Sequence, residues 1–87
     1  MAAEKCNATA EMVRNIIRDS GMETDPYAEA YIQALDQSEE MYGCAGVQSQ
    51  AAYIFGNLKP KTDKEKLAKQ KLLDISRGLT PRATLEV

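Results

Sequence analysis

The chain lacks several residue types on which catalytic and metal sites depend. Its 87 residues include no histidine, no tryptophan, one phenylalanine and two cysteines. Histidine is the side chain that most often transfers protons near neutral pH and is a common zinc ligand, so its absence argues against both roles. A glycine-rich phosphate loop and a serine nucleophile motif are also missing. We therefore predict that the protein is not an enzyme and holds no metal or cofactor.

The two cysteines, Cys6 and Cys44, are too few and too far apart for a disulfide-stapled scaffold or a metal motif. We expect two small, half-buried thiols in a reducing compartment, and a Cys6–Cys44 disulfide is the alternative. No stretch approaches 18 apolar residues, and residues 1–7 lack the apolar core of a signal peptide. These absences predict a cytoplasmic protein that does not bind a membrane.

The chain does contain four segments with the apolar spacing of amphipathic helices. They cover residues 7–20, 26–42, 46–57 and 63–77. Short loops join them, which favours helices packed against their sequence neighbours. We predict a single compact all-α, four-helix domain over residues 1–79, followed by a mobile or extended tail at residues 80–87.

The third segment is the most apolar part of the chain and carries no charge from Gly46 to Leu58. Its larger apolar residues recur at helical spacing and define one face: Val47, Ala51, Ile54, Phe55 and Leu58. Because little on this segment requires water, we predict a central, mostly buried helix against which the other three pack.

Capping residues mark the ends of the predicted helices. Asp25 and Pro26 form a start signal for the second, and Gly43 can end it. Thr62 and Glu65 match a capping box at the start of the fourth. Gly78 should end that helix in a left-handed turn, and Leu79 should fold back as in a Schellman motif.

The second segment offers the best candidates for partner contact. Its predicted apolar stripe is Tyr27, Ala30, Tyr31, Ala34, Leu35, Met41 and Tyr42. Tyrosine suits half-exposed interfaces, and we expect Tyr27 and Tyr42, near the helix ends, to contact a partner. We expect Tyr31 and Tyr53 to fill the core instead. The polar, solvent-facing side of the same segment carries four acidic residues that could bind a basic host protein: Glu29, Asp36, Glu39 and Glu40.

The charges are unevenly distributed along the chain, which has a net charge of −2. Residues 1–44 hold nine acidic and three basic side chains, whereas residues 45–87 hold four acidic and eight basic ones. A lysine-rich stretch raises nucleic-acid binding as an alternative, with Lys61, Lys64 and Lys71 as candidate phosphate ligands. Acidic residues interrupt this stretch and arginine is absent from it, so an ordinary solvated face is the preferred interpretation.

One short motif points to a source. The residues that carry it are Gly46, Val47, Gln50, Tyr53, Ile54, Asn57 and Leu58, followed by the lysines of residues 64–71. In this pattern the chain resembles a loosely defined group of short bacteriophage-encoded helical proteins, although the Trp-Arg-Gly element of their connecting loop is replaced by Lys59-Pro60-Lys61. The resemblance implies a protein of a phage or mobile element, acting in the host cytoplasm. It transfers no functional residue.

These observations together favour a non-enzymatic domain that works by protein–protein contact. Short, acidic, cofactor-free phage proteins often act by occluding a host protein, as anti-CRISPR and host-takeover proteins do, so an inhibitor or regulator is the leading hypothesis. A homodimer is expected because a chain this short builds a thin core. The alternatives are a small nucleic-acid-binding protein and a structural subunit of a phage particle.

Overall fold

The computed structural model describes residues 7–20 and 26–85 of the chain. These residues form four helices: α1 (Asn7–Asp19), α2 (Pro26–Tyr42), α3 (Cys44–Asn57) and α4 (Asp63–Ser76). No strand occurs among the described residues. The predicted all-α four-helix fold is confirmed, and each helix begins and ends within two residues of its predicted bounds. Asp25, part of the predicted start signal of α2, lies outside the described residues.

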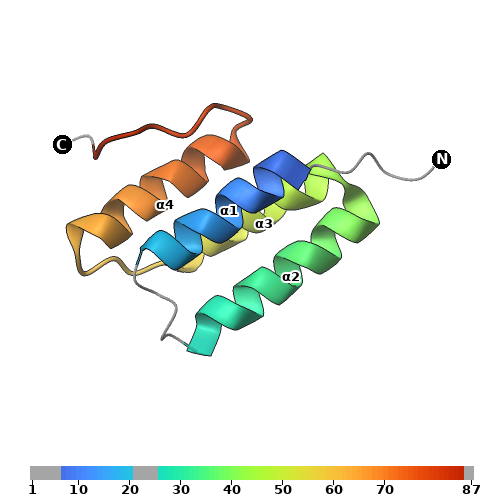
Figure 1. Ribbon diagram of the computed structural model, residues 1–87, viewed down its shortest axis with the longest axis horizontal. Coiled ribbons are helices and arrows are strands. Elements are labelled where there is room, and N and C mark those ends of the chain that lie inside the picture. Colours follow the sequence, from blue (N-terminus) through green and yellow to red (C-terminus); the bar gives the residue numbers. More distant parts are fainter. Residues whose placement is uncertain (1–6, 21–25, 86–87) are drawn as a thin grey trace.

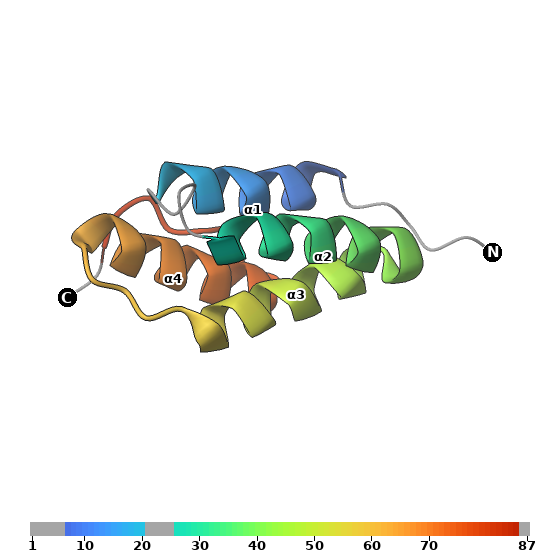
Figure 2. The ribbon, with the colours of Figure 1, turned by 90° about the horizontal axis from the view of Figure 1, so that it is seen from below.

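The four helices pack against one another in layers. Figures 1 and 2 show α1 and α3 on opposite sides of the molecule, with α2 and α4 between them at the two edges. α3 packs most extensively against α2 and α4, its neighbours along the chain. The segment after α4 turns back and runs along that helix toward its beginning (Figure 1).

The core between the helices is aliphatic. The largest fully buried side chains are Val13, Ile17, Leu35, Val47, Ile54, Leu72 and Ile75. Burying each of them contributes roughly 1.5–3 kcal/mol by transfer from water. Tyr31, Ile32 and Phe55 are only partly buried and pack against the edge of this cluster. Aromatic rings therefore lie around the core, not inside it.

A single residue, Gly43, connects α2 to α3, and its φ of 66° lies in the region that favours glycine. The resulting hairpin is very tight. A Cβ placed on Gly46 would lie 2.1 Å from the carbonyl oxygen of Ser38. Only a residue without a side chain allows α2 and α3 to approach so closely at this point.

The predicted ends of α4 are confirmed with one difference. The Thr62 hydroxyl accepts a hydrogen bond from the Glu65 N–H at 3.2 Å, but the Glu65 carboxylate accepts from the Lys61 N–H at 2.7 Å and not from Thr62. At the other end Gly78 has a φ of 75°, and the Leu79 N–H donates to the Asp74 carbonyl at 2.9 Å. This is the Schellman pattern.

The burial pattern corrects several expectations about individual faces. α3 is not mostly buried, because only Gly46, Val47, Ala51 and Ile54 of its residues are. Phe55, predicted to face inward, is half-buried, and the Lys69 ammonium lies 5.1 Å from its ring centre. On α2, Ala28 and Ile32 face the core, whereas four residues of the predicted apolar stripe are exposed: Tyr27, Ala30, Met41 and Tyr42.

The expected free thiol at Cys44 is wrong, because this residue is disulfide-bonded. The only other cysteine, Cys6, lies outside the described residues. Of the described helices, none combines the length and the apolar character needed to cross a bilayer.

Candidate functional site

All four tyrosines of the chain lie along the outside of the α2–α3 hairpin. We call Tyr27, Tyr31, Tyr42 and Tyr53 the tyrosine seam. Three of them come from α2 and one from α3, and the antiparallel packing of the two helices brings them into one row. Tyr31 and Tyr53 meet across the hairpin edge to face, with ring centres 6.4 Å apart. This contact lies near the middle of the seam and fixes the two helices relative to each other.

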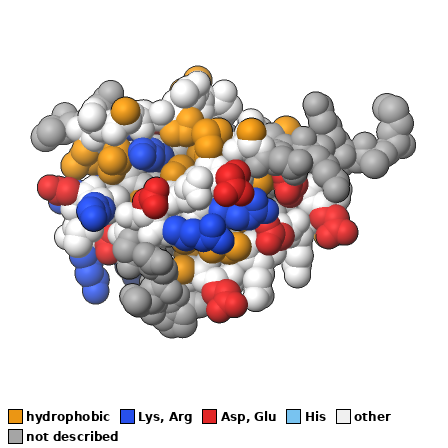
Figure 3. All heavy atoms as spheres, in the orientation of Figure 1, with side chains coloured by type: hydrophobic (Ala, Val, Ile, Leu, Met, Phe, Trp, Pro, Cys, Tyr) orange, Lys and Arg blue, Asp and Glu red, His pale blue; other side chains and the backbone are white. Residues whose placement is uncertain are grey.

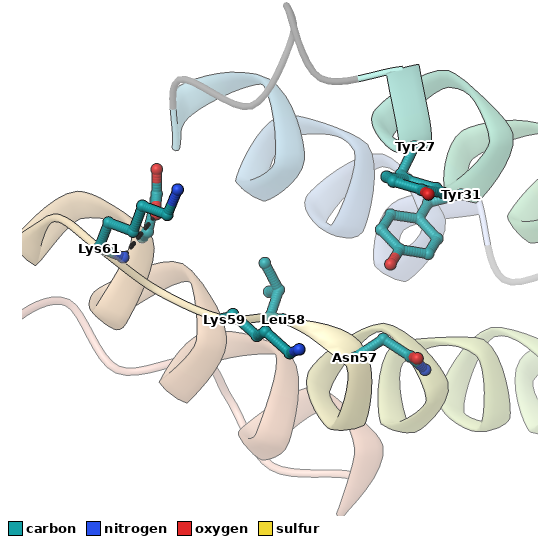
Figure 4. Close-up of a pocket in the computed structure, with 7 residues that line it drawn as sticks. Tyr27, Tyr31, Asn57, Leu58, Lys59 and Lys61 are labelled. Carbon is teal, nitrogen blue, oxygen red and sulfur yellow. Dashed lines mark hydrogen bonds between the residues drawn. The ribbon is translucent and has the colours of Figure 1, made fainter.

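A groove of about 590 Å³ opens at one end of the seam, where α2 begins and α3 ends. Figure 4 shows Tyr27 and Tyr31 projecting from α2 toward the segment that follows α3. The opposite wall is formed by that segment, from Asn57 to Lys61, and by Glu65. The side chains of Lys59 and Lys61 are exposed, and the Glu65 carboxylate lies in the same groove, so charges of both signs lie at this end of the seam.

A second groove, of about 410 Å³, lies at the other end of the seam, beside the α2–α3 turn. Its walls are Tyr42 and Ser38 on one side and Tyr53 on the other, with Ala45, Gly46, Ser49 and Gln50 between them. None of these residues is charged. The Gln50 side-chain nitrogen is buried in this groove and has no hydrogen-bond partner among the described residues.

The seam is unusually open for aromatic residues. Tyr27, Tyr42 and Tyr53 are 67%, 63% and 59% exposed. The expected exposure of Tyr27 and Tyr42 is therefore observed, but the prediction that Tyr53 fills the core is wrong. Next to the seam, the outer face of α3 exposes only small uncharged residues: Ala45, Ser49, Ala52 and Gly56. The seam and these residues together form a face without charged side chains.

The four acidic candidates on α2 do not form one free patch. The Arg14 guanidinium of α1 forms a hydrogen-bonded ion pair with Asp36, and its Nη2 lies 3.9 Å from Glu39. These carboxylates raise the pKa of Arg14, with the hydrogen bond to Asp36 as the largest cause. Glu29 and Glu40 are exposed to solvent. Half of the predicted acidic surface is thus used to join α1 to α2.

The three candidate lysines do not share one stripe. Lys64 and Lys71 line a groove of about 120 Å³ between α1 and α4, together with Asp19. Lys61 lines the tyrosine groove instead. On another side of α4, Lys69 donates to the Leu58 carbonyl at 3.1 Å. The lysines therefore surround the helix, and none of these groups forms a continuous cationic track.

Residues 80–85 are anchored by a cluster that sequence reasoning missed. Asp74 of α4 is 6% exposed and accepts two hydrogen bonds of 2.8 Å from the Arg82 guanidinium. The Arg82 N–H also donates to Asp74, at 3.1 Å. The Arg82 side-chain hydrogen bond is the largest of the effects that lower the pKa of Asp74 to about 2. Further along, Leu85 reaches a groove lined by Phe55 and Pro60.

Among the described residues no three His, Cys, Asp or Glu side chains come together as metal ligands would. The titratable group with the large pKa shift, Asp74, is closed off by its own arginine. What remains exposed and organised is the aromatic, uncharged face of the hairpin.

No protein-family model matches the chain, and neither a curated protein nor a solved structure does. The class that the geometry defines is a small all-α domain with an uncharged aromatic face.

Proposed function

We propose that this protein is a non-enzymatic protein-interaction domain whose contact surface is the tyrosine seam with the neighbouring outer face of α3. The observation that carries the proposal is the exposure of three tyrosines beside a helix face without charge. Interface centres are enriched in tyrosine and depleted of charged residues. A face that only meets solvent would carry charged side chains, as α2 does with glutamate and aspartate and α4 does with lysine.

The short motif shared with phage-encoded helical proteins lies largely on this surface, since Gln50, Tyr53 and Asn57 all line its grooves. We therefore extend the proposal to an inhibitor or regulator of a host protein. The placement of Arg14 weakens the idea of an acidic contact surface on α2, because Asp36 and Glu39 already have a cationic partner.

Three baits test this function in a bacterial lysate. The wild-type protein, a seam variant (Tyr42→Ser with Tyr53→Ser) and a lysine variant (Lys64→Glu with Lys71→Glu) are immobilised and the captured proteins are quantified. We expect at least one protein to be captured by the wild type and the lysine variant and lost by the seam variant. Equal capture by all three baits, or loss only with the lysine variant, would refute the proposal.

The lysine variant also addresses nucleic acid. Binding through phosphate contacts falls steeply as salt rises, so retention of DNA that disappears with salt and with Lys64→Glu and Lys71→Glu would favour the alternative. The distribution of lysines around α4 leads us to expect no such retention.

A further inference from the structure

The groove beside the α2–α3 turn, which we call the turn groove, is lined by aromatic and small polar residues. Two exposed rings, Tyr42 and Tyr53, flank it, and its other lining residues are serine, glutamine, alanine and glycine. Tyrosine, serine and glycine are also the residues that antibody loops favour for binding protein segments, because they combine contact area with adaptable hydrogen bonds. The volume of about 410 Å³ lies within the range of ligand pockets, about 300–1,000 Å³.

The turn groove is electrically neutral. None of the described residues that line it carries a charge at neutral pH. The Glu39 carboxylate faces Arg14 on the other flank of α2, and Glu40 lies two positions before Tyr42, about 200° around the helix. The negative end of α2 and the positive end of α3 meet at Gly43, so their dipoles oppose each other there. A charged side chain entering the groove would lose its hydration without gaining a counter-charge, so we expect a neutral occupant.

One polar atom of the turn groove lacks a partner. The side-chain nitrogen of Gln50, a lining residue, is closed off from solvent and has no hydrogen-bond partner among the described residues. Buried amide groups are normally hydrogen-bonded, and an unpaired one destabilises the fold. The terminal torsion of glutamine is soft, so this nitrogen can turn toward an acceptor that enters the groove. The groove therefore favours an occupant with a free carbonyl oxygen.

We propose that the turn groove binds an extended, uncharged segment of a partner protein. A main-chain carbonyl of that segment accepts a hydrogen bond from Gln50, and a neutral side chain packs between Tyr42 and Tyr53. Main-chain carbonyl groups inside helices and sheets are already paired, whereas those of an extended segment are free to accept. A partner helix laid across the hairpin would leave Gln50 without an acceptor. This inference rests on the proposed function, because it names the part of the partner that the seam recognises.

Selection from a library of random linear peptides tests the occupant. The immobilised wild-type protein should enrich peptides that share an uncharged core, and Gln50→Leu should bind these peptides at least about tenfold more weakly. The matched control is Gln48→Leu, which changes a glutamine of the same helix that lines a different groove, beside α1, and should leave the affinity unchanged.

Gln50→Leu has a second readout, the stability of the free protein. Its thermal midpoint should rise above that of the wild type, because the change removes a buried donor that has no acceptor. A glutamine kept for the fold would give a lower midpoint, so weaker binding together with higher stability identifies a binding residue.

A double-mutant cycle tests the hydrogen bond. In the tightest-binding peptide each main-chain carbonyl is replaced in turn by a methylene group. One replacement should weaken binding to the wild type at least about tenfold and have no further effect on binding to Gln50→Leu, because both changes remove the same bond. Ser49→Asp and Ser49→Lys test neutrality, and both should weaken binding, because either places an uncompensated charge at the groove.

Four results would overturn the proposal. They are a selection that enriches no peptide or only charged cores, equal weakening by Gln50→Leu and Gln48→Leu, tighter binding by either Ser49 variant, and a methylene effect that persists in Gln50→Leu. Binding of a neutral saccharide that Gln50→Leu abolishes, with no peptide enriched, would assign the groove to a sugar and overturn it as well.

Failure of this inference is distinguishable from failure of the proposed function. If the Tyr42→Ser, Tyr53→Ser bait loses a lysate protein that Gln50→Leu still captures, the interaction function stands and the carbonyl contact falls. If Gln50 couples to a peptide carbonyl but no bait captures a lysate protein, the groove chemistry stands and the host-directed function falls.

Discussion

The two flanks of α2 carry different kinds of side chain, which differ in how far they are paired within the molecule. Toward α1, the helix presents Asp36 and Glu39, and Arg14 binds both. Toward α3, it presents Tyr27, Tyr31 and Tyr42, and two of these three rings are more than half exposed. The acidic side chains on one flank are thus paired with an arginine of the same chain, whereas the tyrosine rings on the other flank remain exposed to solvent.

The same contrast separates the faces of the whole domain. Figure 3 shows acidic and basic side chains intermixed over the face that presents α1. α3, on the other side, has no charged residue at all. Exposed apolar area is costly to maintain in water, and three of the six large apolar side chains that the described residues leave exposed belong to the seam.

The packing of α2 against α3 should fail when Gly46 acquires a side chain. Gly46→Ala places a Cβ against the Ser38 carbonyl, so the hairpin must open and the free energy of unfolding should fall by about 3 kcal/mol or more. Gly56→Ala is the control: its Cβ meets nothing within 4 Å, so it should stabilise the helix by about 0.5–1 kcal/mol. Urea denaturation followed by circular dichroism measures both, and equal stabilities would contradict the close approach.

Removal of the tail anchor should cost less. Arg82→Met leaves the buried Asp74 carboxylate without its guanidinium, and we expect a loss of about 2 kcal/mol in the free energy of unfolding. Arg77→Met removes an exposed arginine only three residues from Asp74 and should change stability by less than about 0.5 kcal/mol. If both variants unfold at the same urea concentration, residues 80–85 are not held by this pair.

The same pair predicts a loss of stability in acid. The pKa of Asp74 is about 2 in the folded protein, below the unfolded value of about 3.9. Its contribution, at most about 2 kcal/mol, is therefore complete above about pH 4 and disappears as the pH falls toward 2. Denaturation midpoints measured across this range should show that slope in the wild type and a smaller one in Arg82→Met. Parallel curves would show that Asp74 titrates normally.

The ion pairs between α1 and α2 are more exposed and should matter less. Arg14→Met should lower the free energy of unfolding by about 1 kcal/mol at low salt, because the Arg14 side chain is 21% exposed and its partner Asp36 is 53% exposed. The loss should shrink as salt screens the charges. Arg18→Met, an exposed arginine on the same helix, serves as the control, and an equal effect of the two would argue against a specific role for Arg14.

The exposed tyrosines should contribute least to the fold. Measured at concentrations where the chain is monomeric, Tyr42→Ser should change the free energy of unfolding by less than about 0.5 kcal/mol. Tyr31→Ser should cost about 2 kcal/mol, because this ring packs against the core and against Tyr53. A large loss with Tyr42→Ser would mean that the seam is maintained for folding and not for contact.

Much of the fold could be predicted from spacing alone. Ala10, Val13 and Ile17 recur at helical intervals, as do Ala68, Leu72 and Ile75, and all six are buried. The Schellman turn at Gly78 was also predictable, because it depends on a glycine and on its near neighbours in sequence.

Orientation was harder to predict for helices with few charges. On α3 no charged residue marks the solvent-facing side. The helical spacing of its apolar residues therefore shows that one face is apolar, but it does not show how much of the remaining helix surface is buried. Tyr53 and Phe55 were therefore both assigned to the core, although one is exposed and the other half-buried. On α2 the alanines do not indicate which face is buried, because alanine is tolerated both in the core and on the surface. Ala28 is buried and Ala30 is exposed.

Residue type and spacing within about one helical turn were enough to predict four amphipathic helices and their approximate ends. The pairing of Arg14 with Asp36, the pairing of Arg82 with Asp74 and the alignment of the four tyrosines came only from the packing of the helices. Each of those depends on how helix axes pass one another. A shift of one residue along a helix turns a side chain by about 100°, so small changes in packing select its neighbours.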